Sequence, residues 1–226
     1  MKFTYYGHAC FSVEIAGKKL LFDPFISPNE MAQEIDVDSI DADYILISHG
    51  HEDHVVDVES IAKRTGAKLI SNYEIISWFG EKGLKGHPMN HGGKWNFSFG
   101  SVKCVNAVHS SVLPDGTYGG NPVGFVIESE EGCFYYAGDT ALTLDMQLIP
   151  LTSAPLDFCI LPIGDNFTMG TDEAMLASDF VECDKVIGVH FDTFGYIKID
   201  HSEAKKIFEQ VEKELILPTI GETIEM

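Results

Sequence analysis

The chain has 226 residues, enough for one large domain or two small ones around a hydrophobic core. Apolar residues make up 45% and charged residues 22%, which excludes a disordered chain, collagen-like repeats and a global coiled coil. With 15 Lys+Arg against 35 Asp+Glu, the formal net charge is −20. Such a surface repels phosphate backbones and anionic lipids, so we expect neither nucleic acid nor a membrane as partner.

The cysteines and the N-terminal segment bear on where the protein works. Five cysteines, at positions 10, 104, 133, 159 and 183, show no CxxC spacing, which is typical of free thiols in a reducing compartment. No apolar run approaches the roughly 18 residues that a membrane helix needs. The first residues alternate like strands and lack the charged and apolar parts of a signal peptide. We therefore expect a cytoplasmic protein, of an oligomeric state that the sequence leaves open.

The first part of the chain predicts strands followed by a helix. Residues 1–25 have the pattern of a β meander, and the acidic stretch 27–43 has the length of a functional or mobile loop. Residues 43–49, DYILISH, form an almost continuous apolar run, as expected of a strand buried on both faces. After a polar cluster, helical spacing and a terminal glycine predict a helix over 55–66.

The rest of the chain predicts a second block of the same kind. The expected elements are a strand at 67–72, a helix at 73–83, strands at 94–100, 101–111, 122–132 and 133–140, a strand at 157–164, a helix at 171–182, a strand at 185–191 and a helix at 201–215. Two mixed blocks, with no linker rich in Pro, Gly or Ser between them, predict one layered α/β domain over residues 1–226.

The hexapeptide that follows the buried strand at 43–49 has the pattern HxHxDH. It places His49, His51, Asp53 and His54 together at a strand end, where such polar groups need partners. Zinc and similar metals bind neutral histidine nitrogen and aspartate oxygen. Gly50 allows a tight turn that directs the first two imidazoles to one point, with Asp53 and His54 facing a second. A solvated loop that happens to contain histidines is the weaker alternative.

Three further residues of ligand type stand where predicted strands leave the core. These are His109, Asp139 and His190. Open α/β sheets build their sites at the carboxyl ends of strands. Taken singly, each of the three is as well explained as a turn residue. Taken with the HxHxDH motif, they indicate one metal site assembled from distant parts of the chain.

The order of these residues resembles the ligand series of the metallo-β-lactamase superfamily. Three further segments are similar to a branch of metal-dependent hydrolases related to ascorbate-6-phosphate lactonase, namely Gly7-His8-Ala9, Leu21-Phe22-Asp23-Pro24 and His109-Ser110-Ser111. The resemblance covers essentially the whole chain. It implies a four-layer αββα sandwich of two similar halves with the site along one edge.

The resemblance also implies a pair of divalent ions. One would be held by His49, His51 and His109, the other by Asp53, His54 and His190, with Asp139 and a water or hydroxide between them. Histidine with two carboxylates suits zinc first, and manganese or iron fit the same ligand types. Because Asp53, Asp139 and a hydroxide cancel three of four positive charges, a net positive charge would remain to attract an anionic substrate.

These observations predict a binuclear metal-dependent hydrolase acting on a small molecule. Its bridging hydroxide would cleave an ester, lactone, amide or phosphoester bond in an anionic substrate. Two alternatives share the motif: a mononuclear iron dioxygenase-type member and a non-catalytic metal-binding sensor on the same fold. Metal content and turnover distinguish the three.

Two residues are predicted to act in catalysis. Asp53 would both bind a metal and orient the hydroxide, and His8 would stand at the rim as a substrate hydrogen-bond donor or general acid. A core histidine satisfied by the backbone is the alternative for His8. Asp23 either caps a turn before Pro24 or accepts a hydrogen bond from a ligand imidazole.

The remaining histidines and the loops around the site are less informative. His87, His91 and His201 have no matching ligand nearby and are interpreted as surface residues. Substrate specificity is expected in the loops at 24–43, 111–122 and 164–172, whose composition does not identify the substrate.

Overall fold

The computed structural model describes residues 1–226, and its strands form two mixed sheets of seven strands each. The strands of the first sheet are β14 (Thr223–Glu225), β1 (Lys2–Gly7), β2 (Cys10–Ile15), β3 (Lys18–Phe22), β4 (Tyr44–Leu46), β5 (Lys68–Asn72) and β6 (Gly86–Met89), in that spatial order. Those of the second are β13 (Glu214–Ile216), β12 (Lys185–Val189), β11 (Phe158–Pro162), β10 (Gly132–Tyr136), β9 (Val123–Ser129), β8 (Gly100–Asn106) and β7 (Lys94–Phe97).

The two sheets share one plan. In the first, β14, β1, β2 and β3 pair antiparallel, and the pairing from β3 through β6 is parallel. In the second, β7 through β10 pair antiparallel, and β10 through β13 pair parallel. Each half therefore consists of an antiparallel meander followed by βα units, which agrees with the two similar halves that the sequence predicts.

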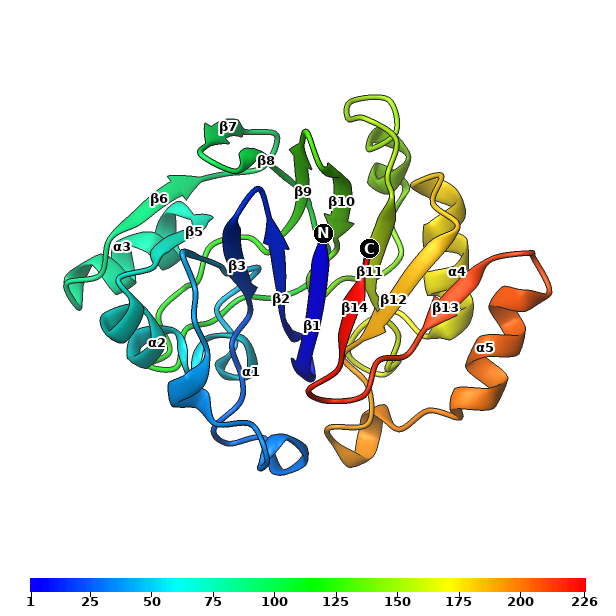
Figure 1. The fold of residues 1–226 in the computed structure, drawn as a ribbon, viewed down its shortest axis with the longest axis horizontal. Coiled ribbons are helices and arrows are strands. Elements are labelled where there is room, and N and C mark those ends of the chain that lie inside the picture. The colour runs from blue at the N-terminus through cyan, green and yellow to red at the C-terminus, as the bar shows by residue number, and fades with distance from the viewer.

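Helices cover the outer face of each sheet, so the molecule has four layers (Figure 1). The helices are α1 (Glu52–Val55), α2 (Val58–Thr65) and α3 (Tyr73–Glu81) on the first sheet, and α4 (Thr171–Phe180) and α5 (His201–Glu209) on the second. A cluster of 22 buried side chains fills the space between the sheets, with Phe11 and Phe22 from one facing Phe125 and Phe134 from the other. Alternation along the meander strands supplies this inner face.

Some predicted elements differ in extent from the observed ones. The strand predicted at 43–49 is only three residues long as β4, and the helix predicted over 55–66 is divided between α1 and α2. Helix α5 ends at Glu209, because the chain turns there so that β13 can pair with β12. The short edge strands β6 and β14 carry too few apolar residues to be recognised, and β6 contains Pro88, which is tolerated at a sheet edge.

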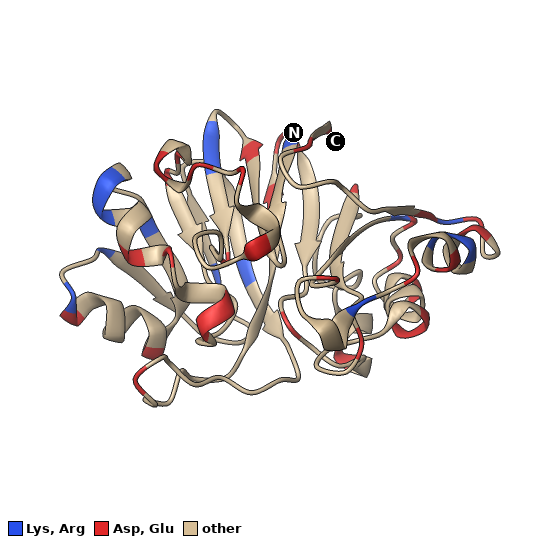
Figure 2. Cartoon of the chain, turned by 90° about the horizontal axis from the view of Figure 1, so that it is seen from below, with Lys and Arg blue, Asp and Glu red and all other residues tan.

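Acidic side chains dominate the surface, as the composition implies. Viewed from below, Asp and Glu are spread over helices and loops, whereas Lys and Arg occupy fewer positions (Figure 2). None of the helices is long and apolar enough to cross a membrane.

Candidate metal centre

The seven predicted ligands meet at one edge of the two sheets. Four of the histidines surround the Oδ2 oxygen of Asp139, which follows β10. It lies 3.0 Å from Nε2 of His190, 3.4 Å from Nε2 of His54, 3.7 Å from Nε2 of His109 and 3.9 Å from Nε2 of His49. A single carboxylate oxygen thus faces four imidazole nitrogens, which come from both halves of the chain.

Three histidines form the first group of ligand atoms, which we call the open cluster: His49, His51 and His109. Nε2 of His49 lies 2.9 Å from Nδ1 of His51, and both rings are 5.1 Å from that of His109, centroid to centroid. The hydroxyl of Ser110 lies 3.3 Å from Nε2 of His51, and that of Ser111 accepts the Gly50 amide. The His-Ser-Ser segment therefore supports the loop that carries the motif.

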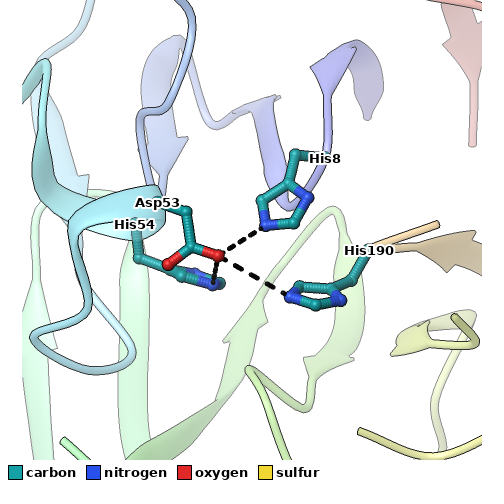
Figure 3. Close-up of side chains that lie close together, drawn as sticks. All are labelled: His8, Asp53, His54 and His190. Carbon is teal, nitrogen blue, oxygen red and sulfur yellow. Dashed lines mark hydrogen bonds and ion pairs between the residues drawn. The ribbon is translucent and has the colours of Figure 1, made fainter. Parts of the chain in front are cut away.

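The second group, which we call the deep cluster, contains Asp53, His54 and His190, with His8 beside them (Figure 3). Oδ2 of Asp53 is 3.9 Å from Nε2 of His54 and 4.0 Å from Nε2 of His190. Nε2 of His8 lies 3.0 Å from the same oxygen. His54 and His190 are almost completely buried, because they stand above the core between the sheets.

A buried carboxylate, Asp23, fixes the protons of two ligand histidines. It accepts hydrogen bonds from Nδ1 of His54 at 2.9 Å, from the hydroxyl and amide of Ser48 at 2.5 and 2.7 Å, and from the Tyr136 hydroxyl at 2.6 Å. Since the Ser48 proton goes to Asp23, Nδ1 of His49, 2.9 Å from Ser48 Oγ, must donate to that oxygen. Both histidines then direct Nε2, the nitrogen that remains for a metal, toward the site.

His8 is buried, as its alternative interpretation as a core histidine expects, and does not lie at the rim. Its side chain contacts Asp53 but does not line the cavity, and the residue is 1% exposed. The second ring nitrogen, Nδ1, is 3.0 Å from the Thr193 hydroxyl. Burial lowers the pKa of His8 to about 4, so the ring is neutral and its one proton serves the Asp53 carboxylate. A satisfied histidine beneath the surface is poorly placed to touch substrate, and its geometry instead fits holding Asp53 in position.

The local backbone at the site is strained where it has to turn side chains inward. His8, Asp23 and His190 all have left-handed φ values, of 55°, 40° and 56°. The His190 amide donates to the His8 carbonyl, so two of these turns hold one another. Gly50 does not have a positive φ, but a Cβ there would lie 3.2 Å from the Leu113 side chain and 3.3 Å from the Val112 backbone, which is a tight contact. A glycine at position 50 is therefore favoured by the limited space beside Leu113, and not by a left-handed backbone conformation.

The donor set fits cations, as the buried polar atoms show. Nε2 of His54, Oδ1 of Asp139 and Nδ1 of His190 are buried without a hydrogen-bond partner. Burial lowers the pKa of His54, but Asp139, Asp53 and Asp23 outweigh it and raise the pKa well above its usual value. A group of carboxylates around one imidazole therefore favours positive charge at this point. Buried carboxylates are costly, and a cation at Nε2 of His54 would compensate those around it.

His49 and Asp139 are in the protonation states that a metal requires. Burial, with His54 alongside, keeps the pKa of His49 well below its usual value, so its imidazole is neutral. Burial alone would raise the pKa of Asp139, but His190 and His54 hold it well below the ordinary range. Neutral imidazoles and ionised carboxylates are the forms that bind divalent metals.

A cavity of about 830 Å³ opens over the two clusters. His51, Asp53, His109, Asp139 and His190 line its floor. Its walls come from the predicted loops at 24–43 and 164–172, and from residues 193–196, which follow β12. The predicted loop at 111–122 does not contribute to the lining. The segment 193–196 had no signal of its own in the sequence beyond its place after His190.

Three supporting residues were not predicted. Ser48 and Tyr136 contact Asp23, and Thr193 contacts His8. In the sequence, Ser48 and Tyr136 belong to apolar strands, and only their placement just before His49 and Asp139 could have drawn attention to them. His87 and His91 are partly buried and His201 is exposed, all outside the cavity, in agreement with their interpretation as surface residues.

Comparison with known proteins places this arrangement in a family. Residues 2–190 match the β-lactamase superfamily domain. A UPF0173 metal-dependent hydrolase of Flavobacterium johnsoniae is 59% identical over 226 residues, and one of Christiangramia forsetii is 56% identical over 227, each covering 100% of both chains. The solved structure of Igni18, a metallo hydrolase from the archaeon Ignicoccus hospitalis, matches with a TM-score of 0.88 and 32% identity, covering 99% of this chain and 97% of that one.

The fold, the His and Asp donors and these matches define a metal-dependent hydrolase of the metallo-β-lactamase superfamily. This confirms the predicted αββα fold and enzyme class. Within the superfamily, the chain belongs to the UPF0173 metal-dependent hydrolase family. The individual roles of the seven ligands stay predictions.

Proposed function

We propose that the enzyme uses two divalent metal ions to hydrolyse an ester, lactone, amide or phosphoester bond in a small molecule. One ion would be held by the open cluster, the other by the deep cluster, and Asp139 would bind both. The observation that carries this proposal is the position of Asp139, whose Oδ2 faces Nε2 of histidines in both clusters within 4.0 Å. One oxygen between two sets of nitrogens is the arrangement that a shared ligand needs.

The residues of the chain have separable tasks in this reaction. Two bound divalent ions supply an activated water and an electrophile for the oxygen under attack. The Asp53 side chain is 28% exposed against 4% for Asp139. Asp53 is therefore the carboxylate that can accept a hydrogen bond from the attacking water and orient it. His8 holds Asp53, and Asp23 holds His54 and, through Ser48, His49.

Zinc is the first candidate for both ions, because the donors are histidine nitrogen and aspartate oxygen. Manganese and iron accept the same ligand types. The five cysteines are all unpaired and buried, which supports a reducing location such as the cytoplasm.

Metal analysis and a substrate panel test the proposal. The purified enzyme is assayed for bound metals, then for turnover of matched esters, lactones, amides and phosphoesters before and after EDTA. Two equivalents of metal with EDTA-sensitive turnover support it. One iron with oxygen uptake favours the dioxygenase, and bound metal without any turnover favours the sensor. Sugar-phosphate lactones in the panel test the predicted relation to ascorbate-6-phosphate lactonase.

A further inference from the structure

Aromatic rings form much of the cavity wall above the metal ligands. Phe25, Phe167, Phe194 and Tyr196 line it, and they come from three separate segments of the chain. Phe167 is 51% exposed and Tyr196 is 79% exposed, although apolar rings gain free energy when they leave water. Exposed aromatic side chains gathered around a concave site are typical of a surface that a ligand covers.

The four rings form two pairs at different depths. The Phe194 ring is 5.2 Å from the His8 ring and 6.2 Å from that of Phe25, so this pair stands next to the deep cluster. The rings of Phe167 and Tyr196 are 6.4 Å apart, and both are exposed. An apolar substituent bound between the pairs would therefore lie between the reacting bond and solvent.

The cavity has no basic side chain to bind an anionic substituent. Its lining contains no lysine and no arginine, and Glu30 adds a carboxylate beside the metal ligands. Lys198, two residues beyond Tyr196, lines a different cavity together with Asp165 and Asp172. A phosphate or carboxylate remote from the reacting bond would thus meet acidic neighbours without a compensating cation.

We infer, given the proposed function, that the substrate is a neutral ester, lactone or amide with an aromatic or branched apolar group bound against these rings. Bound ions would supply positive charge for the bond under attack, and the rings would bind the rest of the molecule. This differs from the anionic substrate that the sequence predicts from the charge of the ions alone. The cavity walls favour the neutral substrate over the anionic one, because the walls contact the part of the substrate that does not react.

The inference is tested with metal-loaded enzyme and esters that share one leaving group. 4-Nitrophenyl phenylacetate and 4-nitrophenyl hexanoate are compared with mono-4-nitrophenyl adipate, which replaces the terminal methyl of the hexanoate by a carboxylate. We expect kcat/KM for the neutral esters to exceed that for the adipate by about tenfold or more. Equal or better turnover of the adipate overturns the inference and leaves the proposed hydrolase intact. No turnover of any ester or other panel member contradicts the proposed function instead.

Substitutions of the aromatic residues in the cavity wall test whether these rings cause the preference for neutral esters. Phe194→Ala should lower kcat/KM for the phenylacetate by about tenfold, whereas Phe194→Leu should lose less. Tyr196→Arg should raise kcat/KM for the adipate by about fivefold relative to the hexanoate, since it adds the missing cation. Tyr73→Ala, on α3, is the control, because Tyr73 is 62% exposed but lies outside the cavity. Equal effects of Tyr73→Ala and Phe194→Ala would contradict the inference.

A binding measurement makes the test independent of turnover. N-phenyl-1-naphthylamine is neutral and fluorescent, and 1-anilinonaphthalene-8-sulfonate is the same molecule with a sulfonate. We expect the neutral probe to bind the metal-loaded enzyme more tightly, and Phe194→Ala to weaken it while Tyr73→Ala does not. Tighter binding of the sulfonate, or binding that the wall variant leaves unchanged, overturns the inference whatever the enzyme hydrolyses.

Discussion

The open and deep clusters use similar side chains in different surroundings. In the open cluster, His51 and His109 are partly exposed and line the cavity. Ser110 and Ser111, which follow His109, contact the loop that carries His51. In the deep cluster, His54 is fully buried and is held by Asp23. Two of the three histidines of the open cluster are thus partly exposed, whereas both histidines of the deep cluster are buried.

Because of this difference, substitutions in the two clusters should differ in how strongly they affect metal binding and the stability of the fold. The deep cluster joins the two halves of the molecule, because His190 follows β12, His54 belongs to α1, and the His190 amide donates to the His8 carbonyl. Its side chains contribute to the core as well as to the site. The open cluster also joins the halves, through Ser110 and Ser111, but the rings of His51 and His109 are partly exposed. Changes at these two histidines should therefore affect metal and activity more than stability.

The largest effect is expected at the one residue that both clusters share. Asp139→Asn removes the charge that faces four histidines, so both ions should bind more weakly. Substitution of a residue that only supports a metal ligand lowers metal affinity or activity by about 10–100-fold. Asp139 is proposed to bind the ions itself, so we expect kcat to fall by more than about 100-fold. Elemental analysis and kcat of the purified variant measure both quantities. Asp157→Asn, an exposed carboxylate that binds only the Cys133 amide, is the control. Full metal content with normal kcat would remove Asp139 from the proposed site.

Matched alanine variants compare the clusters directly. His51→Ala and His54→Ala should each lose one equivalent of metal and most activity. His54→Ala should also destabilise the metal-free fold by about 3 kcal/mol, because it leaves a buried cavity and takes a donor from Asp23. His51→Ala should leave that stability nearly unchanged, since its ring is partly exposed. Thermal unfolding in EDTA measures the difference, and equal melting temperatures of the two variants would contradict the distinction between clusters.

A smaller effect on both ions is expected from Asp23→Asn. The amide cannot accept all the hydrogen bonds that hold His54, Ser48 and Tyr136, so the orientation of His54 and His49 should loosen. We expect metal affinity to fall by about 10–100-fold, without loss of any ligand. Asp57→Asn is a matched control, because Asp57 is also a buried acceptor but serves the amides of Ile26 and Ser27. Competition with a chromophoric chelator measures affinity, and similar values for both variants would exclude a role in orienting ligands.

What the sequence predicts well are elements with a strong local pattern and residues with unusual chemistry. The HxHxDH motif and the strand-end His109, Asp139 and His190 are visible because buried ligand-type side chains are rare. The sequence could not decide between a rim and a core position for His8, because its burial depends on contacts such as Thr193, 185 residues away in the chain. The wall residue Tyr196 carries no pattern either, since an aromatic residue in a loop looks the same whether it lines a cavity or not. Such features depend on tertiary contacts alone.

The smallest effect, and the sharpest distinction, concerns His8. If His8 positions Asp53, His8→Phe should lower the affinity of the deep cluster for its ion by about tenfold. His8→Gln should lose less, because its amide can still donate to the Asp53 carboxylate. The shape of the pH profile of kcat/KM should be unchanged in both, since burial already keeps His8 neutral, with a pKa of about 4. A general acid predicts the reverse: unchanged metal affinity and loss of the alkaline limb in both variants. Metal titration and pH profiles of the same preparations therefore decide whether His8 acts on the substrate or only through Asp53.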